Sequence, residues 1–219
     1  MTMLQILFLA AVQGAAELLP VSSSAHVIVA AKLMGLDPTT PEMTLLLVML
    51  HTGTMFAVIL FFWKSWRASF FTSRGQFWSS CRLILAATAL TGVVGLGLKA
   101  AIERLAFGKA AHAEIEMLFG NLGLISAALA AVGVLIVYAG LKGSRAAAPK
   151  GEVGTGEACV IGAVQGLCLP LRGFSRSGAT ISTGLLLGVA RDRVEGFSFA
   201  LAVVLTPPVI AREVLRSFE

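Results

Sequence analysis

The stretch AVQGAAELLPVSSSAH occupies residues 11–26, and its apolar first half ends at a proline followed by three serines. Apolar residues begin at Met3 and resume after the serines as far as Met34. Neither half reaches the roughly 20 residues that a membrane-spanning helix needs. We therefore predict a helix in, a polar turn and a helix out. Irregular backbone at membrane depth is tolerated only where protein or a wet cavity surrounds it.

A second segment has the same layout. Residues 163–178 read AVQGLCLPLRGFSRSG, and the apolar residues run from Ala158 to Leu169 and again from Ala179 to Val189. The letters AVQG occur at both 11–14 and 163–166, and the same offset aligns Ser23 with Ser175. The shared order of apolar half, proline, serine-containing turn and apolar half predicts an internal repeat.

The composition predicts that lipid surrounds the chain. Of its 219 residues 57% are hydrophobic and 13% are charged, whereas a soluble domain carries about 25% charged residues. The mean hydropathy is +0.86. Four further segments are long enough, or nearly so, to span a bilayer: Met43–Phe62, Leu83–Ala101, Leu118–Ala139 and Gly196–Arg212. The last contains Pro207 and Pro208, which we expect to break or kink it.

The positive charges predict the topology. If both broken segments return to their own side, three spans separate them and they enter from opposite faces. One face then holds Lys64, Arg67, Arg74, Arg82, Lys142, Arg145, Lys150, Arg191 and Arg193, and the other holds few basic residues among several acidic ones. The first face is therefore the cytoplasmic one. We predict an all-α, polytopic integral membrane protein of one domain, residues 1–219, built from inverted repeats: about 1–100 with the re-entrant pair 3–34, and about 118–219 with the re-entrant pair 158–189.

The first break concentrates polar groups. Gln13 and Glu17 share one helix face, and a carboxylate inside a membrane helix is a functional hypothesis by default. Ser22, Ser23 and Ser24 begin the outgoing helix, where one serine would suffice as a cap. His26 follows one turn later and is a candidate proton carrier beside a hydroxyl. The alternative is that Glu17 and His26 only support packing.

The second break adds a fixed cation. Arg176 has a planar fork suited to phosphate oxygens, and apolar residues on both sides argue against a side chain that only reaches the membrane surface. Gly173 and Gly178 permit close backbone approach. Two helix N-termini, an arginine, hydroxyls and a carboxylate favour phosphoryl transfer. No Walker loop is present, so nucleotide hydrolysis is not expected.

The two motifs together resemble a known family. LPVSSSAH at 19–26, preceded by Gln13 and Glu17, and GFSRSGATIS at 173–182 are similar to the two signatures of the bacitracin-resistance family of undecaprenyl-diphosphate phosphatases. HTGT at 51–54 is also similar, and the resemblance covers essentially the whole chain. It implies removal of the terminal phosphate of the polyprenyl diphosphate carrier in the bacterial inner membrane, recycling of the carrier for cell-wall synthesis, bacitracin resistance, and a site that opens to the periplasmic face.

The resemblance also implies roles for single residues. Ser23 corresponds to the family's proposed nucleophile, His26 to its catalytic histidine, Glu17 to its acidic residue and Arg176 to its phosphate-binding arginine. The further phosphate-binding candidates are Ser22, Ser24, Ser175, Ser177, Gly178 and Gln165. A divalent cation, Mg²⁺ or Ca²⁺, is associated with the family, and Glu17 with Gln13 is the pair placed to bind it. Family members usually continue for about two transmembrane helices beyond the position of Glu219.

Two alternatives stay open at this point. A transporter or flippase for a polyprenyl phosphate would need the arginine and the helix ends, but not Ser23 with His26. Direct attack by water would replace attack by Ser23. We expect a polyprenyl diphosphate and membrane lipids as partners and no nucleic acid, and we leave a homodimer open.

Overall fold

The computed structural model describes residues 1–17, 19, 21–104, 121–143, 151–171 and 173–216. These residues form helices and contain no β-strand element: α1 (Met3–Glu17), α2 (Ser23–Leu33), α3 (Pro41–Phe70), α4 (Arg74–Ile102), α6 (Leu122–Gly143), α7 (Thr155–Cys168), α8 (Arg176–Leu186) and α9 (Arg191–Arg216). The expectation of an all-α fold is confirmed.

Four of the described helices are long and apolar enough to cross a membrane. They are α3, α4, α6 and the 191–211 part of α9. The 30 residues of α3 rise about 45 Å at 1.5 Å each, more than the roughly 30 Å of a bilayer core. The chain is therefore a multi-pass membrane protein. The predicted third span begins later than expected, at Leu122, and residues 118–120 lie outside the described part.

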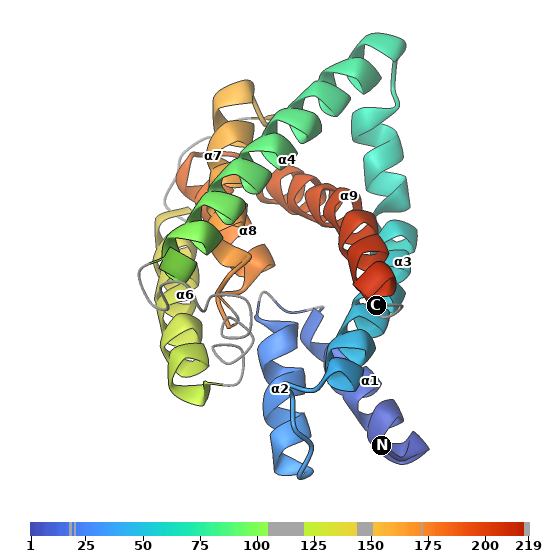
Figure 1. Cartoon of the computed structure of the whole chain (residues 1–219). Helices are drawn as coiled ribbons and strands as arrows, with labels where there is room; N and C mark the ends of the chain where they lie inside the picture. Colours follow the sequence, from blue (N-terminus) through green and yellow to red (C-terminus); the bar gives the residue numbers. More distant parts are fainter. Residues whose placement is uncertain (18, 20, 105–120, 144–150, 172, 217–219) are drawn as a thin grey trace.

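Both broken segments form helix pairs. The first apolar half ends as α1 at Glu17, and α2 begins at Ser23 and packs against α1. The second ends as α7 at Cys168, and α8 begins at Arg176 and packs against α7. Figure 1 shows α1 and α2 extending from the middle of the molecule toward its lower edge, whereas α7 lies in the upper half. The helix breaks are confirmed, and their re-entry into a bilayer stays a prediction.

The proline pair does not end α9. The helix continues through Pro207 and Pro208 to Arg216, and the ribbon turns in its C-terminal part (Figure 1). The sequence predicted a break or a kink at this position. The continuous helix excludes a break and is compatible with a kink. Helix α9 packs against α3, where Trp66 Nε1 donates to the Gly196 carbonyl oxygen at 2.9 Å.

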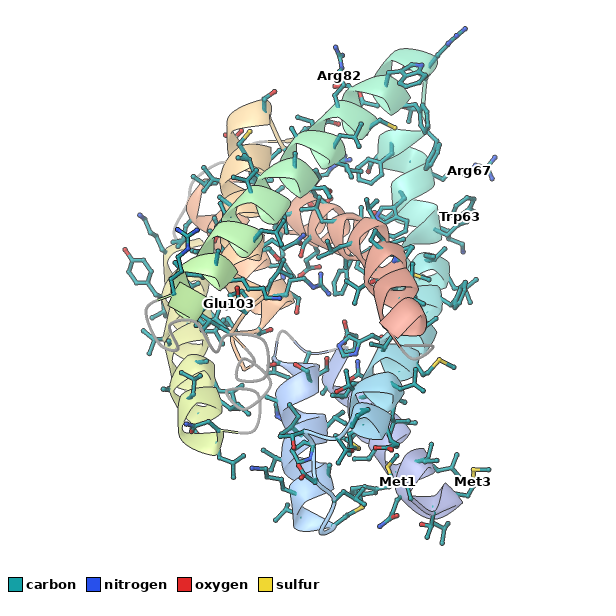
Figure 2. The ribbon with its side chains drawn as sticks, viewed as in Figure 1. Met1, Met3, Trp63, Arg67, Arg82 and Glu103 are labelled. Atoms are coloured by element: carbon teal, nitrogen blue, oxygen red, sulfur yellow. The ribbon has the colours of Figure 1, made fainter. Side chains whose placement is uncertain are left out.

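Two arginines of the predicted cytoplasmic face lie toward the same end of the molecule. Arg67 and Arg82 lie at the upper end in Figure 2, and Met1 and Met3 lie at the opposite end. Arg67 is in the last turn of α3, and Arg82 lies in the first half of α4. These two arginines, which the topology argument assigned to one face, are therefore together at one end of the fold.

Helices α4 and α7 are in close contact through small residues. Gly162 and Gly166 on α7 face Ala87 and Thr91 on α4, and a Cβ at Gly162 would overlap the Ala87 carbonyl oxygen. Thr91 Oγ1 donates to the Gly162 carbonyl oxygen at 2.9 Å. Small residues four apart let helix backbones approach in this way inside membranes. The contact holds α7, and with it the second break, against a full-length span.

We predict that Gly162→Ala destabilises the protein, because the added methyl group overlaps α4 backbone that cannot move independently. The expected cost is about 1–3 kcal/mol, the usual range for overpacking, seen as a lower midpoint of thermal unfolding in detergent. Gly97→Ala is the matched control, since Gly97 lies on α4 and a methyl group added there would meet nothing within 4 Å. Equal midpoints for both variants would contradict the assignment of this contact.

Candidate active site

The two helix breaks meet, although they are far apart in sequence. Arg176 Nη2 lies 3.6 Å from Glu17 Oε1, so the first residue of α8 forms an ion pair with the last residue of α1. A cavity of about 340 Å³ is lined by both breaks. The prediction that the two segments form two sides of one site agrees with this geometry.

Glu17 is the centre of the first side. Its Oε2 accepts hydrogen bonds from the Ser23 hydroxyl at 2.7 Å and from Gln13 Nε2 at 3.1 Å. Gln13 is 1% exposed and Ser23 is 8% exposed. A short hydrogen bond from a hydroxyl to a carboxylate orients the hydroxyl and provides an acceptor for its proton. Ser23 is thus the serine of the three whose side chain is bonded to a base.

The N-terminus of α2 is open. Ser22 is its N-cap residue, but its side chain makes no capping hydrogen bond. The Ser22 hydroxyl instead lies 3.3 Å from the Ser24 hydroxyl. The backbone N–H groups of the first turn are therefore free of a side-chain cap, and with the helix dipole they favour an anion at this position.

On the second side of the site, the break before α8 is fixed by a side-chain cap and by a close contact with α6. The hydroxyl of Ser175 caps α8 by accepting from the Gly178 N–H at 3.1 Å, and it lies 3.4 Å from the Ser177 hydroxyl. Gly173 has a φ of +97°, and a Cβ there would lie 2.6 Å from the Ile125 carbonyl oxygen. Only glycine fits both the left-handed backbone and this contact with α6. The break is therefore held in one shape against α6.

The guanidinium of Arg176 is oriented from both sides. Besides its ion pair with Glu17, Nη1 donates to the Ser198 carbonyl oxygen on α9 at 3.4 Å. The hydroxyls of Ser198 and Thr180 are 2.6 Å apart, and Thr180 Oγ1 also donates to the Arg176 carbonyl oxygen. The sequence did not identify Ser198 as a site residue, because it does not show which part of α9 lies next to Arg176.

Most of the predicted site residues line the cavity. These are Glu17, Ser22, Ser23, Ser24, Ser175, Arg176 and Ser177. Helix α3 contributes one face, Thr44, Leu47, Val48 and His51, and α9 contributes Ala202, Leu205, Thr206, Val209 and Ile210. Glu17, Arg176 and the serines lie at the two breaks, whereas α3 and α9 add a wall that is largely apolar apart from Thr44, His51 and Thr206. A site with one charged end and one apolar wall suits an amphiphile.

Four predicted residues do not line this cavity, and one of them is Gln13, which is buried next to Glu17. His26 is exposed on α2, and its Nδ1 is 2.7 Å from the Ser22 carbonyl oxygen. Gln165 is fully buried and donates to Thr91 Oγ1 at 3.3 Å, so it lies in the contact between α7 and α4. Gly178 N–H is bonded to Ser175. Their roles in binding or catalysis stay predictions.

The residues present fit a divalent cation only in part. Among the described residues, no group of three His, Cys, Asp or Glu side chains could hold a metal ion. However, Gln13 Oε1 is buried without a described hydrogen-bond partner, beside the Glu17 carboxylate. Mg²⁺ is usually held by one or two carboxylates together with substrate phosphates. Among the described residues that line the cavity, Glu17 is the only carboxylate, and metal binding by Glu17 with Gln13 stays a prediction.

Comparison with known proteins identifies the family of the chain. The family described as Bacitracin resistance protein BacA matches residues 6–217. The protein named Undecaprenyl-diphosphatase 2 of Acinetobacter baylyi is 56% identical over 216 residues, covering 99% of this chain and 75% of that protein. The protein named Undecaprenyl-diphosphatase of Salinibacter ruber is 32% identical over 222 residues, covering 100% of this chain and 78% of that protein. The chain belongs to the BacA family of bacitracin resistance proteins.

Proposed function

We propose that the chain hydrolyses undecaprenyl diphosphate to undecaprenyl phosphate and inorganic phosphate. The observation that carries this proposal is the bond of the Ser23 hydroxyl to Glu17, next to Arg176, on the wall of one cavity. The names of the two relatives support the same reaction. This activity recycles the lipid carrier of cell-wall synthesis and accounts for bacitracin resistance.

Binding uses both ends of the cavity. The terminal phosphate lies between the open N-terminus of α2 and the guanidinium of Arg176, which has a fork that matches phosphate oxygens. The first isoprene units contact the apolar wall of α3 and α9, for example Leu205 and Val209. The cavity holds the head group, and the rest of the long chain remains among membrane lipids.

The reaction starts at Ser23. Its oxygen attacks the terminal phosphorus, its proton moves to Glu17, and the bond to the bridging oxygen breaks, which releases the lipid monophosphate. Arg176 stabilises the charge that spreads over the phosphoryl oxygens. A divalent cation, Mg²⁺ or Ca²⁺, held by Glu17, Gln13 and the substrate would supply further neutralisation of the phosphates. Water then hydrolyses the phosphoserine.

The orientation in the membrane is part of the proposal. The end that carries Arg67 and Arg82 lies in the cytoplasm by the positive-inside rule, and the paired helices α1 and α2 extend toward the opposite face (Figure 2). The site opens to the periplasmic face of the inner membrane. A homodimer is compatible with this arrangement but is not needed to complete the cavity wall.

A phosphate-release assay tests the function against its main alternative. Purified protein in detergent is expected to release inorganic phosphate from a C55 polyprenyl diphosphate and none from the monophosphate. The same preparation in vesicles is assayed for movement of labelled lipid across the bilayer. Lipid movement without phosphate release would reject hydrolysis in favour of a transporter or flippase.

A further inference from the structure

One histidine, His51, lies at the cavity and is not used in the reaction described above. The ionisable side chains on the cavity wall are Glu17 from α1, His51 from α3, Cys168 from α7 and Arg176 from α8. The described part of α9 contributes no ionisable side chain to the wall. Hydrolysis of a phosphoserine needs a group that accepts a proton from water, so each of the four can be compared for this role.

Three of the four are already engaged. Glu17 accepts from Ser23 and Gln13 and forms an ion pair with Arg176. Arg176 has no lone pair to accept a proton. Cys168 is 7% exposed, and its Sγ donates to the Val164 carbonyl oxygen at 3.1 Å. His51 remains.

The backbone fixes the tautomer of His51. Its Nδ1 lies 2.7 Å from the Leu47 carbonyl oxygen, one turn earlier on α3. A carbonyl oxygen only accepts, so Nδ1 carries the hydrogen and Nε2 of the neutral ring carries the lone pair. In the part of the chain that the structure describes, no hydrogen bond to Nε2 is found, and His51 is one of the residues that line the cavity.

The position of His51 on α3 explains why it reaches the cavity. Thr44, Leu47, Val48 and His51 follow the spacing of one helix face, and all four line the cavity. His26 has the same bond from Nδ1 to the carbonyl oxygen four residues earlier, but its side chain is exposed and outside the cavity wall. The two histidines therefore differ in location, not in the tautomer that the backbone imposes.

We propose that His51 is the general base that activates the hydrolytic water in this reaction. The inference rests on the proposed phosphatase function. Water attacks the phosphorus of phosphoserine 23 from the α3 wall, its proton moves to His51 Nε2, the bond from phosphorus to Ser23 Oγ breaks, and the serine oxygen regains the proton held by Glu17. His51 then releases its proton to solvent as inorganic phosphate leaves. Each turnover consumes one water and releases one proton.

The test compares His51→Gln with His26→Gln in the intact purified chain. Glutamine keeps hydrogen-bonding groups at each position but cannot titrate. We expect His51→Gln to lower kcat about 10²-fold, the low end of general base catalysis, with KM changed little. The second readout is the covalent intermediate. His51→Gln quenched in acid during turnover should carry more labelled phosphate than wild type, because only hydrolysis of the phosphoserine is slowed. His26→Gln should lower kcat less than His51→Gln and should not accumulate labelled protein.

The outcomes separate this inference from the function beneath it. If wild type releases no phosphate from the lipid diphosphate, the proposed function fails. If wild type is active but His51→Gln keeps kcat within about threefold, or loses activity without accumulating labelled protein, the base assignment fails and the function stands. A loss of rate with accumulation of labelled protein in His26→Gln alone would transfer the role to His26. Equal unfolding midpoints of the variants exclude misfolding as the cause.

Discussion

Arg176→Ala is expected to lower kcat/KM for phosphate release about 10³-fold or more, the range that arginines contribute to phosphoryl transfer. The guanidinium is held by Glu17 on one side and by the Ser198 carbonyl oxygen on the other, so it is oriented before substrate arrives. Ordering of this side chain on substrate binding therefore costs little conformational entropy. The positive charge of the guanidinium stabilises the negative charge of the transferring phosphoryl group. The measurement is steady-state release of inorganic phosphate from the lipid diphosphate.

A second substitution separates catalysis from folding. Alanine also leaves the Glu17 carboxylate without its ion-pair partner at a partly buried position, which costs stability. Arg176→Lys keeps the charge but loses the planar fork, and it should still lower kcat/KM about 10²-fold. Arg191→Ala removes an arginine that is 75% exposed and paired with Glu195, and it should leave the rate unchanged. Near-normal activity of Arg176→Lys would show that charge alone is required.

The sequence was sufficient to predict where the fold is interrupted. Proline followed by a cluster of serines or by Gly-Phe-Ser-Arg-Ser stops an apolar run by removing donors and offering local alternatives to the helix. Opposite entry of the two segments, inferred from counting spans and basic loops, stays a prediction. The residue types of the two motifs predicted that Arg176 and Glu17, distant in the chain, belong to one site, and the two side chains are 3.6 Å apart.

Two pairs of side chains show what the sequence alone could not provide. Gln13 and Gln165 occupy matching positions of the repeat, but Gln13 bonds to Glu17 whereas Gln165 bonds to Thr91 on α4. The partner depends on which helix packs alongside. His26 and His51 differ in the same way, because the rotation of α2 and α3 about their axes decides which histidine meets the cavity. The sequence shows that the α3 residues lining the cavity share one helix face. It does not show which part of the molecule that face contacts.

Ser23→Ala is expected to abolish measurable phosphate release, with a loss of about 10⁴-fold or more, as when a nucleophile that acts with its base is removed. The reason is local: Ser23 donates to Glu17 at 2.7 Å, and the structure describes no such bond for Ser22 or Ser24, whose hydroxyls face each other instead. Ser22→Ala and Ser24→Ala remove hydrogen bonds to a bound phosphate, and each should lose only about tenfold. The three variants each lack one hydroxyl oxygen and can be assayed side by side.

The size of the residual rate in Ser23→Ala also decides between the two routes of hydrolysis. If Ser23 is the nucleophile, wild type quenched in acid during turnover should carry labelled phosphate from the terminal position of the lipid, and Ser23→Ala should carry none. If water attacks directly, the hydroxyl only positions that water through Glu17, no labelled protein forms, and Ser23→Ala loses about 10²-fold, the contribution of one positioned donor. The carboxylate of Glu17 serves both routes, so Glu17→Gln must be inactive in either case. A Glu17→Gln variant with normal activity would therefore contradict the site itself, whichever route the serine result favours.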